Sequence, residues 1–282
     1  SPSSDSAGSP ELDLLGMDLP DTLRLILSVT DLTTLEATDT PGKVRALCRT
    51  AVRPAPESAH APAVAAVCVY PTLVGVAAES LKGTGVETAS VAGAFPSGMS
   101  PLHLRVEEVR YAVGEGATEI DAVLPRGVFL DGDWNRAHDE IAAVKEACGA
   151  APLKLILETG ELPDPAAIYS ASAIALDAGS DFIKTSTGKI QPAATLSAFL
   201  AMLHALRAYR DRTGQMRGIK ASGGIRTWQQ AVAYLRVAQE VLGVGGAWAD
   251  WSADWFRFGA SSLVADTASR LGSATAELQG GS

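Results

Sequence analysis

The sequence predicts an α/β fold, a (β/α)8 TIM barrel in a single domain with a flexible N-terminal tail. Short apolar runs rich in β-branched residues alternate with alanine-rich stretches of helical period, which is the pattern of parallel βαβ units. The length of 282 residues suits one barrel of about 250 residues plus its ends. Polar residues gather toward the C-terminal ends of the strand-like runs, where a barrel carries its active site. These residues are Asp31, Asp121, Glu158, Lys184 and Lys220.

Eight stretches have the composition of buried strands. In chain order they are residues 23–32, 64–70, 87–93, 118–125, 153–160, 180–186, 217–224 and 256–262. The helix candidates between them are residues 41–52, 102–116, 134–149, 165–179, 195–214 and 227–243. An open doubly wound sheet, the alternative fold, usually carries a glycine-rich dinucleotide turn after its first strand. The segment that follows the first candidate strand has no such turn, which favours the barrel.

The two ends of the chain differ in composition from the region between them. The first residues are rich in serine, proline and glycine, and the last ones read AELQGGS. Such segments bury too little apolar surface to offset the entropy cost of ordering them. We therefore expect a disordered N-terminal tail over residues 1–20, the barrel over residues 21–272 and a flexible C-terminal tail over residues 273–282.

Composition and charge limit the function classes. With a net charge of −9 and a pI near 5.0, the chain lacks the basic excess that nucleic acids require, so we expect no nucleic-acid partner. No apolar run is long enough for a membrane span, and we expect no membrane partner. The cysteines are odd in number and far apart, which indicates reduced thiols in a cytoplasmic protein; they are Cys48, Cys68 and Cys148. We expect neither a metal nor another cofactor, since the histidines are equally scattered.

Three of the strand-end residues interrupt runs that are otherwise apolar: Asp121 in EIDAV, Lys184 in DFIKTS and Lys220 in GIKAS. One interpretation is an internal salt bridge, although desolvation makes buried ion pairs poor stabilisers. The other is chemical, because a neighbouring cation and an apolar wall both lower the pKa of a lysine and make its amine nucleophilic. Such an amine forms a Schiff base with a carbonyl compound, while a nearby carboxylate transfers protons. The three residues could therefore cleave a carbon–carbon bond without a metal.

Two glycine–serine segments follow the last two candidate strands. They cover residues 222–224 and residues 259–262. Loops after strands seven and eight of a barrel often hold a phosphate through backbone N–H groups and hydroxyls. Glycine allows the backbone to approach an anion closely. Together the two segments indicate a small phosphorylated aldehyde or sugar as the substrate.

Eight ordered blocks give the chain a family resemblance that extends from Leu23 to Leu271. The blocks are DLTTLEATDT, AAVCVYP, ASVAGAFPSG, GATEIDAVLP, LKLILETGEL, GSDFIKTSTGK, GIKASGGIRT and FRFGASSL. With them the chain resembles the deoxyribose-phosphate aldolases, a family of class I (Schiff-base) aldolases. The resemblance implies a metal-independent lyase on a (β/α)8 barrel. It implies reversible cleavage of 2-deoxy-D-ribose 5-phosphate to acetaldehyde and D-glyceraldehyde 3-phosphate.

The resemblance also implies roles for individual residues. Lys184 would form the Schiff base, Lys220 would lower the pKa of Lys184 and assist proton transfer, and Asp121 would act as acid and base on the substrate hydroxyl. The residues implied to surround the substrate and its phosphate are Asp31, Thr33, Thr187, Gly188, Lys189, Gly223, Gly224, Ser261 and Ser262. The expected partners are small sugar-phosphate and aldehyde substrates, together with further copies of the chain in a dimer or tetramer. The expected pathway is deoxyribonucleotide catabolism.

One family feature is missing, and two other functions stay open. Some members end in a tyrosine that helps to protonate the enamine, and the last residues here, TAELQGGS, contain none. A phosphate-binding barrel isomerase or lyase would use Lys184 and Asp121 for proton transfer alone. A non-catalytic barrel would only bind phosphosugars, although the presence of both lysines and the aspartate disfavours it.

Other residues have structural interpretations. Lys154 is expected to support the site electrostatically, in a pair with Glu158. Cys68 is expected to be a core residue near the pocket. The tryptophans of WADWSADWF are expected to pack the last helix against the barrel or to form a contact between copies of the chain; they are Trp248, Trp251 and Trp255.

Overall fold

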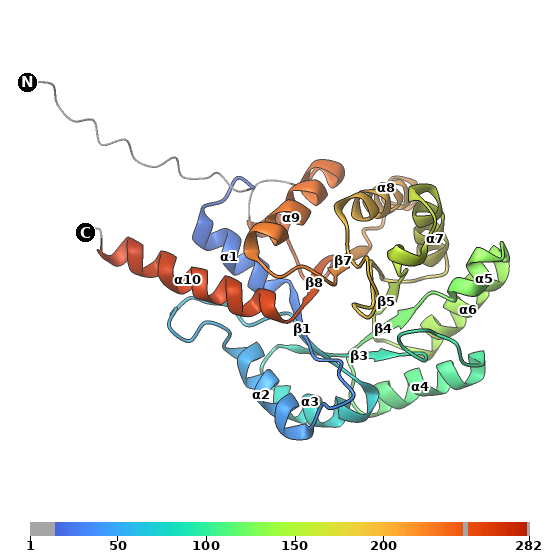
Figure 1. Ribbon diagram of the computed structural model, residues 1–282, viewed down its shortest axis with the longest axis horizontal. Coiled ribbons are helices and arrows are strands. Elements are labelled where there is room, and N and C mark those ends of the chain that lie inside the picture. The colour runs from blue at the N-terminus through green and yellow to red at the C-terminus, as the bar shows by residue number, and fades with distance from the viewer. Residues whose placement is uncertain (1–14, 245–247, 281–282) are drawn as a thin grey trace, which may run out of the picture.

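The strands of the protein form one closed barrel. The computed structural model describes residues 15–244 and 248–280, and within them eight parallel strands pair in chain order, with the last pairing back to the first (Figure 1). They are β1 (Thr30–Thr33), β2 (Ala66–Val69), β3 (Glu87–Ala92), β4 (Glu119–Val123), β5 (Leu153–Ile156), β6 (Phe182–Lys184), β7 (Gly218–Ser222) and β8 (Phe256–Ala260). The predicted (β/α)8 barrel is therefore confirmed.

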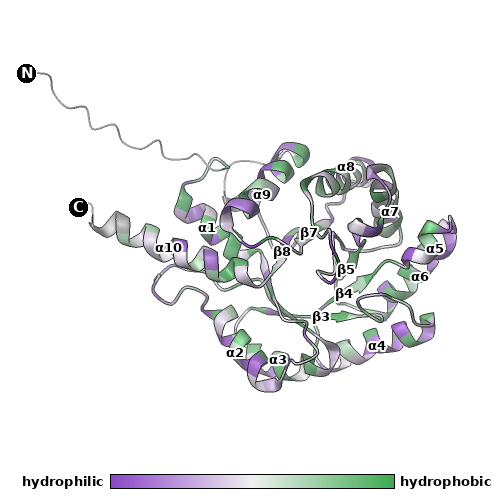
Figure 2. Cartoon of the chain, in the orientation of Figure 1, coloured by the Kyte–Doolittle hydropathy of each residue, from purple (hydrophilic) through white to green (hydrophobic). Residues whose placement is uncertain are grey.

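Helices surround the strands, and the core lies between the two layers (Figure 1). In the described ranges they are α1 (Leu19–Ser28), α2 (Pro41–Val52), α3 (Val74–Leu81), α4 (Leu102–Gly114), α5 (Arg126–Leu130), α6 (Trp134–Ala147), α7 (Pro165–Asp177), α8 (Leu196–Thr213), α9 (Trp228–Leu242) and α10 (Ser262–Gly280). Three short 3-10 turns are η1 (Pro71–Leu73), η2 (Thr159–Glu161) and η3 (Trp248–Asp250). Figure 2 shows hydrophobic and hydrophilic residues interleaved along these helices, as expected for helices with one face in the core.

The first predicted strand, residues 23–32, is wrong over most of its length. Helix α1 extends to Ser28, and β1 begins only at Thr30. The carboxylate of Asp18 accepts a hydrogen bond from the backbone N–H of Asp21, and a proline stands in the first turn. Both features are helix-start signals. The apolar side chains of this run therefore pack as a helix against α9 and α10 instead of pairing in the sheet.

The ends of the barrel differ in secondary structure from what we expected. Helix α1 begins at Leu19, inside the predicted N-terminal tail, and residues 1–14 of that tail lie outside the described residues. Helix α10 continues to Gly280, through most of the range in which we predicted a flexible tail. The domain limits themselves stay predictions. Among the described residues, no helix is both long and apolar enough to cross a membrane.

The tryptophan-rich segment packs against the barrel. Trp251 is buried and stacks on Trp255, with ring centroids 5.1 Å apart. Both rings meet Phe256 of β8 edge-on, at 5.3 Å and 5.8 Å. Trp251 and Trp255 therefore pack against β8 of the barrel, and their predicted contact with the last helix or with another copy stays a prediction. The side chain of Trp248 lies outside the described residues.

Gly218 at the start of β7 makes room for an aromatic ring. A Cβ at this position would lie 2.3 Å from two ring carbons of Phe182, its partner in β6. We predict that Gly218→Ala lowers the free energy of unfolding by about 1–3 kcal/mol, because the ring cannot move without disturbing the close-packed interior. Urea unfolding measures the effect. Gly272→Ala is the control, since a Cβ in that part of α10 meets nothing within 4 Å and should leave stability unchanged or raise it. Equal stability of Gly218→Ala and the parent chain would contradict the prediction.

Candidate active site

Strand register brings two lysines and an aspartate together inside the barrel. Lys184 of β6 and Lys220 of β7 are Cα partners in neighbouring strands, so their side chains point to the same face. Asp121 reaches them from β4. Its Oδ2 accepts hydrogen bonds from Lys184 Nζ at 2.8 Å and from Lys220 Nζ at 2.7 Å. The three residues predicted to be catalytic are therefore in direct contact, and their roles stay predictions.

Lys154 extends this contact toward the base of the barrel. Its Nζ donates to Glu119 Oε2 at 2.5 Å and to Asp121 Oδ1 at 3.0 Å, and it lies 3.2 Å from Asp31 Oδ2. The predicted pair between Lys154 and Glu158 is wrong. Lys154 lies on the inner face in the middle of β5, whereas Glu158 follows the end of that strand and binds other groups.

Asp31 and Arg257 complete the cluster. Asp31 Oδ2 accepts a hydrogen bond from Lys220 Nζ at 2.5 Å, and its Oδ1 accepts one from Arg257 at 2.7 Å. Arg257 also donates to both carboxylate oxygens of Glu119, at 2.7 Å and 3.0 Å. Glu119 and Arg257 were not singled out in the sequence. The sequence does carry a signal for both, because each is a charged residue inside an apolar strand. Glu119 stands two positions before Asp121, and Arg257 stands two positions before Gly259.

The cluster carries one more positive than negative group. Its carboxylates are Asp31, Glu119 and Asp121, and its cations are Lys154, Lys184, Lys220 and Arg257. All are buried, and an unbalanced buried charge is costly. Loss of one proton from one lysine would balance the charges as three against three.

Burial and the neighbouring charges favour Lys184 as the group that loses this proton. Burial lowers the pKa of Lys184 most strongly, Asp121 opposes that effect and Lys220 adds to it, so the pKa lies below the ordinary lysine value. Burial would lower the pKa of Lys220 too, but Asp121 and Asp31 outweigh it and raise the pKa. Carboxylates likewise outweigh burial and raise the pKa of Lys154.

Asp121 is ionised in the cluster, whereas the nearby thiol of Cys68 is protonated. Burial alone would raise the pKa of Asp121, but the ammonium groups around it, that of Lys154 first, hold the pKa well below the ordinary range. The carboxyl group is therefore ionised. Cys68 of β2 lies nearby, fully buried, and burial raises the pKa of its thiol to about 11. The thiol therefore stays protonated near neutral pH, as suits the core residue that the sequence predicts.

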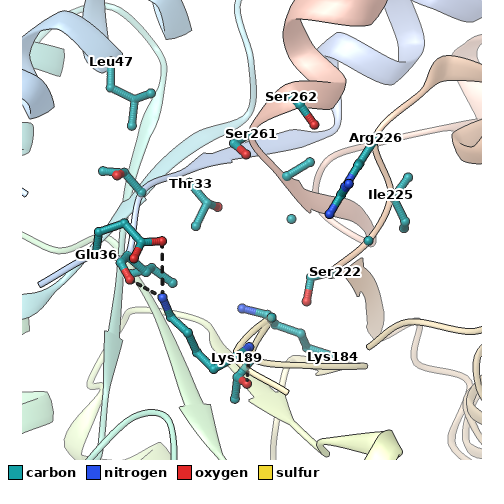
Figure 3. Close-up of a pocket in the computed structure, with 18 of the residues that line it drawn as sticks. Thr33, Glu36, Leu47, Lys184, Lys189, Ser222, Ile225, Arg226, Ser261 and Ser262 are labelled. Atoms are coloured by element: carbon teal, nitrogen blue, oxygen red, sulfur yellow. Dashed lines mark hydrogen bonds and ion pairs between the residues drawn. The ribbon is translucent and has the colours of Figure 1, made fainter. Parts of the chain in front are cut away.

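A cavity of about 570 Å³ opens above the cluster, and Lys184 reaches it (Figure 3). Lys220, Asp121 and Asp31 lie beneath the cavity and do not line it. Lining residues that the sequence predicts are Thr33, Lys184, Thr187, Gly188, Lys189, Gly223, Gly224, Ser261 and Ser262. Figure 3 shows the amine of Lys184 directed toward the open space. The amine of Lys184, a possible nucleophile, thus lies at the floor of the cavity.

The part of the cavity beside β7 and β8 suits an anion. Gly223 and Gly224 have φ angles of 87° and 81°, a left-handed conformation that favours glycine. Ser261 and Ser262 lie at the start of α10, where the first turn leaves backbone N–H groups without helical acceptors. Arg226 also lines this end and is not among the residues predicted from the sequence (Figure 3). Its signal was a cation two residues after the glycine pair, in GGIR.

Comparisons with known proteins agree with this geometry. The family model described as DeoC/LacD family aldolase matches residues 25–266. The mouse and human deoxyribose-phosphate aldolases are each 44% identical over 247 residues, which cover 84% of this chain and 76% of theirs. A solved tetrameric deoxyribose phosphate aldolase from Aeropyrum pernix is similar, with a TM-score of 0.66 and 27% identity, covering 95% of this chain and 96% of that one.

Replacement of Lys220 should change the pKa of Lys184. In Lys220→Leu the cluster keeps three cations and three carboxylates, and the amine that repels the Lys184 proton is gone. We predict that the pKa of Lys184 rises, so that the neutral fraction at a given pH falls and the pH profile of its reaction with an aldehyde moves to higher pH. The measurement is the rate of borohydride trapping with acetaldehyde as a function of pH.

A matched control is Lys145→Leu. Lys145 pairs with Asp181 outside the cluster and should leave the profile unchanged. A Lys220→Leu profile that coincides with that of the parent chain would remove Lys220 from control of this pKa.

Proposed function

We propose a reaction for this chain, which belongs to the DeoC/LacD family of aldolases: reversible cleavage of 2-deoxy-D-ribose 5-phosphate through a Schiff base on Lys184. The family makes the chain a carbon–carbon lyase of the deoxyribose-phosphate aldolase kind. One observation carries the mechanism. Of the four cations in the cluster, only Lys184 lines the cavity, and it is also the lysine of lowered pKa.

In the proposed first step, the neutral amine of Lys184 attacks C1 of the open-chain sugar. The carbinolamine that forms takes up a proton from the solvent, loses its hydroxyl group as water and becomes a protonated imine, which withdraws electrons from C2. Asp121 supports this step because its Oδ2 lies 2.8 Å from Lys184 Nζ and stays ionised, so it stabilises the positive nitrogen. Lys220 donates a hydrogen bond to the same oxygen and is proposed to assist the proton transfers of this step.

In the second step, the bond between C2 and C3 breaks. A base removes the proton of the C3 hydroxyl, C3 becomes the aldehyde of D-glyceraldehyde 3-phosphate, and the bonding electrons form an enamine on Lys184. Protonation at C2 and addition of water then release acetaldehyde and restore the amine. We assign the base role to Asp121, acting through a water because the carboxylate lies beneath the cavity floor.

The phosphate is proposed to bind at the opposite end of the cavity. Backbone N–H groups near Gly223 and Gly224, the hydroxyls of Ser261 and Ser262 and the guanidinium of Arg226 supply the donors. Local donors of this kind are required because the net charge of −9 repels an anion at long range. The cavity volume of about 570 Å³ accommodates a five-carbon sugar phosphate.

Three further properties are proposed with this function. The three cysteines are free and buried, which agrees with a reducing, cytoplasmic environment. A homo-oligomer is supported by the tetramer described for the Aeropyrum pernix relative. The proposed pathway is deoxyribonucleotide breakdown, in which the reaction releases two small aldehydes.

Trapping of the imine tests the proposed function directly. The protein is incubated with acetaldehyde, reduced with borohydride and mapped by mass spectrometry. We expect a reduced adduct on Lys184 and much less on Lys189, which lines the same cavity and serves as an internal control. A Lys184→Met variant should show neither adduct nor cleavage. Cleavage by the parent chain without an adduct on Lys184 would instead indicate that the lysine only transfers protons.

Asp121→Asn separates imine formation from bond cleavage. The amide keeps the shape of the side chain but cannot accept a proton, so we predict that cleavage of the sugar phosphate falls by about 10²- to 10⁴-fold. Trapping with acetaldehyde should persist, because it requires no removal of a hydroxyl proton. Both rates are measured on the same preparation, with a folded state confirmed by circular dichroism. Near-parental cleavage would exclude Asp121 as the base.

A further inference from the structure

Glu158 occupies an unusual backbone position at the top of the barrel. It lies between β5 and the turn η2, with φ 55° and ψ 63°. This is a left-handed backbone conformation that disfavours most residues other than glycine and asparagine. Its exposed fraction is 1%. Backbone strain of this kind persists only where the surrounding contacts enforce it, and it gathers at functional sites.

The carboxylate of Glu158 accepts three hydrogen bonds from two residues. Thr187 donates its backbone N–H to Oε1 at 3.1 Å and its hydroxyl to Oε2 at 2.6 Å. Arg126 donates to Oε2 at 3.2 Å. The backbone on either side of Glu158 is also fixed to β6, because Leu157 N–H bonds the carbonyl of Lys184 at 2.8 Å. Glu158 therefore holds the turn that follows Lys184 in one place.

Arg126 anchors Glu158 to two other loops. Its guanidinium donates to the carbonyls of Pro96 and Ser97, at 2.8 Å and 3.1 Å, and pairs with Glu161 at 3.0 Å. The side chain of Arg126 is 12% exposed, so these bonds are largely protected from water. The loops after β3, β4, β5 and β6 are thus connected through one ion pair.

The turn that Glu158 holds forms one wall of the cavity. Thr187, Gly188 and Lys189 all line it. The Thr187 hydroxyl gives its hydrogen to Glu158 and accepts one from the Lys189 N–H at 3.1 Å, so it can face a ligand only as an acceptor. Lys189 in turn extends across the cavity, where its Nζ bonds the carbonyl of Leu35 (Figure 3).

We propose that Glu158, anchored by Arg126, is a positioning residue that sets the Thr187–Lys189 wall against the hydroxyl and phosphate end of the substrate. The inference rests on the proposed function, since it concerns the same cavity. It assigns to Glu158 no contact with the reacting carbons. Acetaldehyde has only the two carbons next to the imine nitrogen, so the wall matters for the sugar phosphate and not for this small aldehyde.

The test compares two assays in Glu158→Gln. An amide accepts hydrogen bonds on one side only, so it cannot serve the N–H and the hydroxyl of Thr187 together with Arg126. We expect kcat/KM for 2-deoxyribose 5-phosphate to fall by about tenfold or more, chiefly through KM, because a charge-assisted hydrogen bond is lost. Borohydride trapping of acetaldehyde on Lys184 should stay within about twofold.

Glu140→Gln is the matched control. Glu140 is also a buried carboxylate that pairs with two arginines, Arg105 and Arg136, but it lies on α6 away from the cavity. This variant should keep both rates. Should Glu158→Gln fail to fold, Arg126→Gln loosens the same anchor and is expected to raise KM in the same direction, again with trapping retained.

The outcomes separate this inference from the proposed function. An unchanged kcat/KM in Glu158→Gln, an equal fall in both assays, or an equal loss in Glu140→Gln would overturn the positioning role. For Arg126→Gln, unchanged KM or an equal fall in both assays would do the same. Absence of an adduct on Lys184 in the parent chain would instead contradict the Schiff-base mechanism.

Discussion

The excess of one positive charge inside the closed barrel is the constraint on which the rest of the site depends. The cluster is buried, and an unbalanced buried charge costs on the order of several kcal/mol. The excess disappears when one cation releases a proton, and the cation with the fewest carboxylate partners releases it most easily. Lys184 contacts one carboxylate, Lys220 contacts two and Lys154 contacts three. The reactive amine is thus selected by its position within the cluster.

The barrel makes this arrangement possible because strand register fixes neighbours on its inner face. Space is supplied by glycine: a Cβ on Gly259 would lie 2.9 Å from Cε of Lys220, so the lysine stem fits only beside a residue without a side chain. Phe182, admitted by Gly218 and lying 5.8 Å below the guanidinium of Arg257, adds an aromatic contact near the base of the cluster. A rigid apolar wall keeps the charges desolvated, which is what lowers the pKa of Lys184.

The sequence predicted the barrel and most of the site because both depend on local pattern. Charged residues that interrupt apolar strands pointed to Lys184, Lys220 and Asp121, and their position toward the C-terminal ends of those strands indicated the face of the barrel where they meet. The pairing of Lys154 could not be predicted in the same way, because it depends on the heights at which side chains from different strands meet. Helix α1 was missed because the apolar spacing in LRLIL fits both periods, and only its cap distinguishes them.

Charge serves different purposes in the strands and in the loops above them. Charges in the barrel are buried and therefore little screened by dissolved ions, and their sum sets the protonation of one amine. Lys189 and Glu36 at the mouth are 30% and 63% exposed, and a pair of this kind is weak and screened by salt. A rise in ionic strength therefore weakens ion pairs in the loops that receive an anionic substrate more than it weakens those of the cluster. Capture of the substrate and activation of the amine are in this way electrostatically separate.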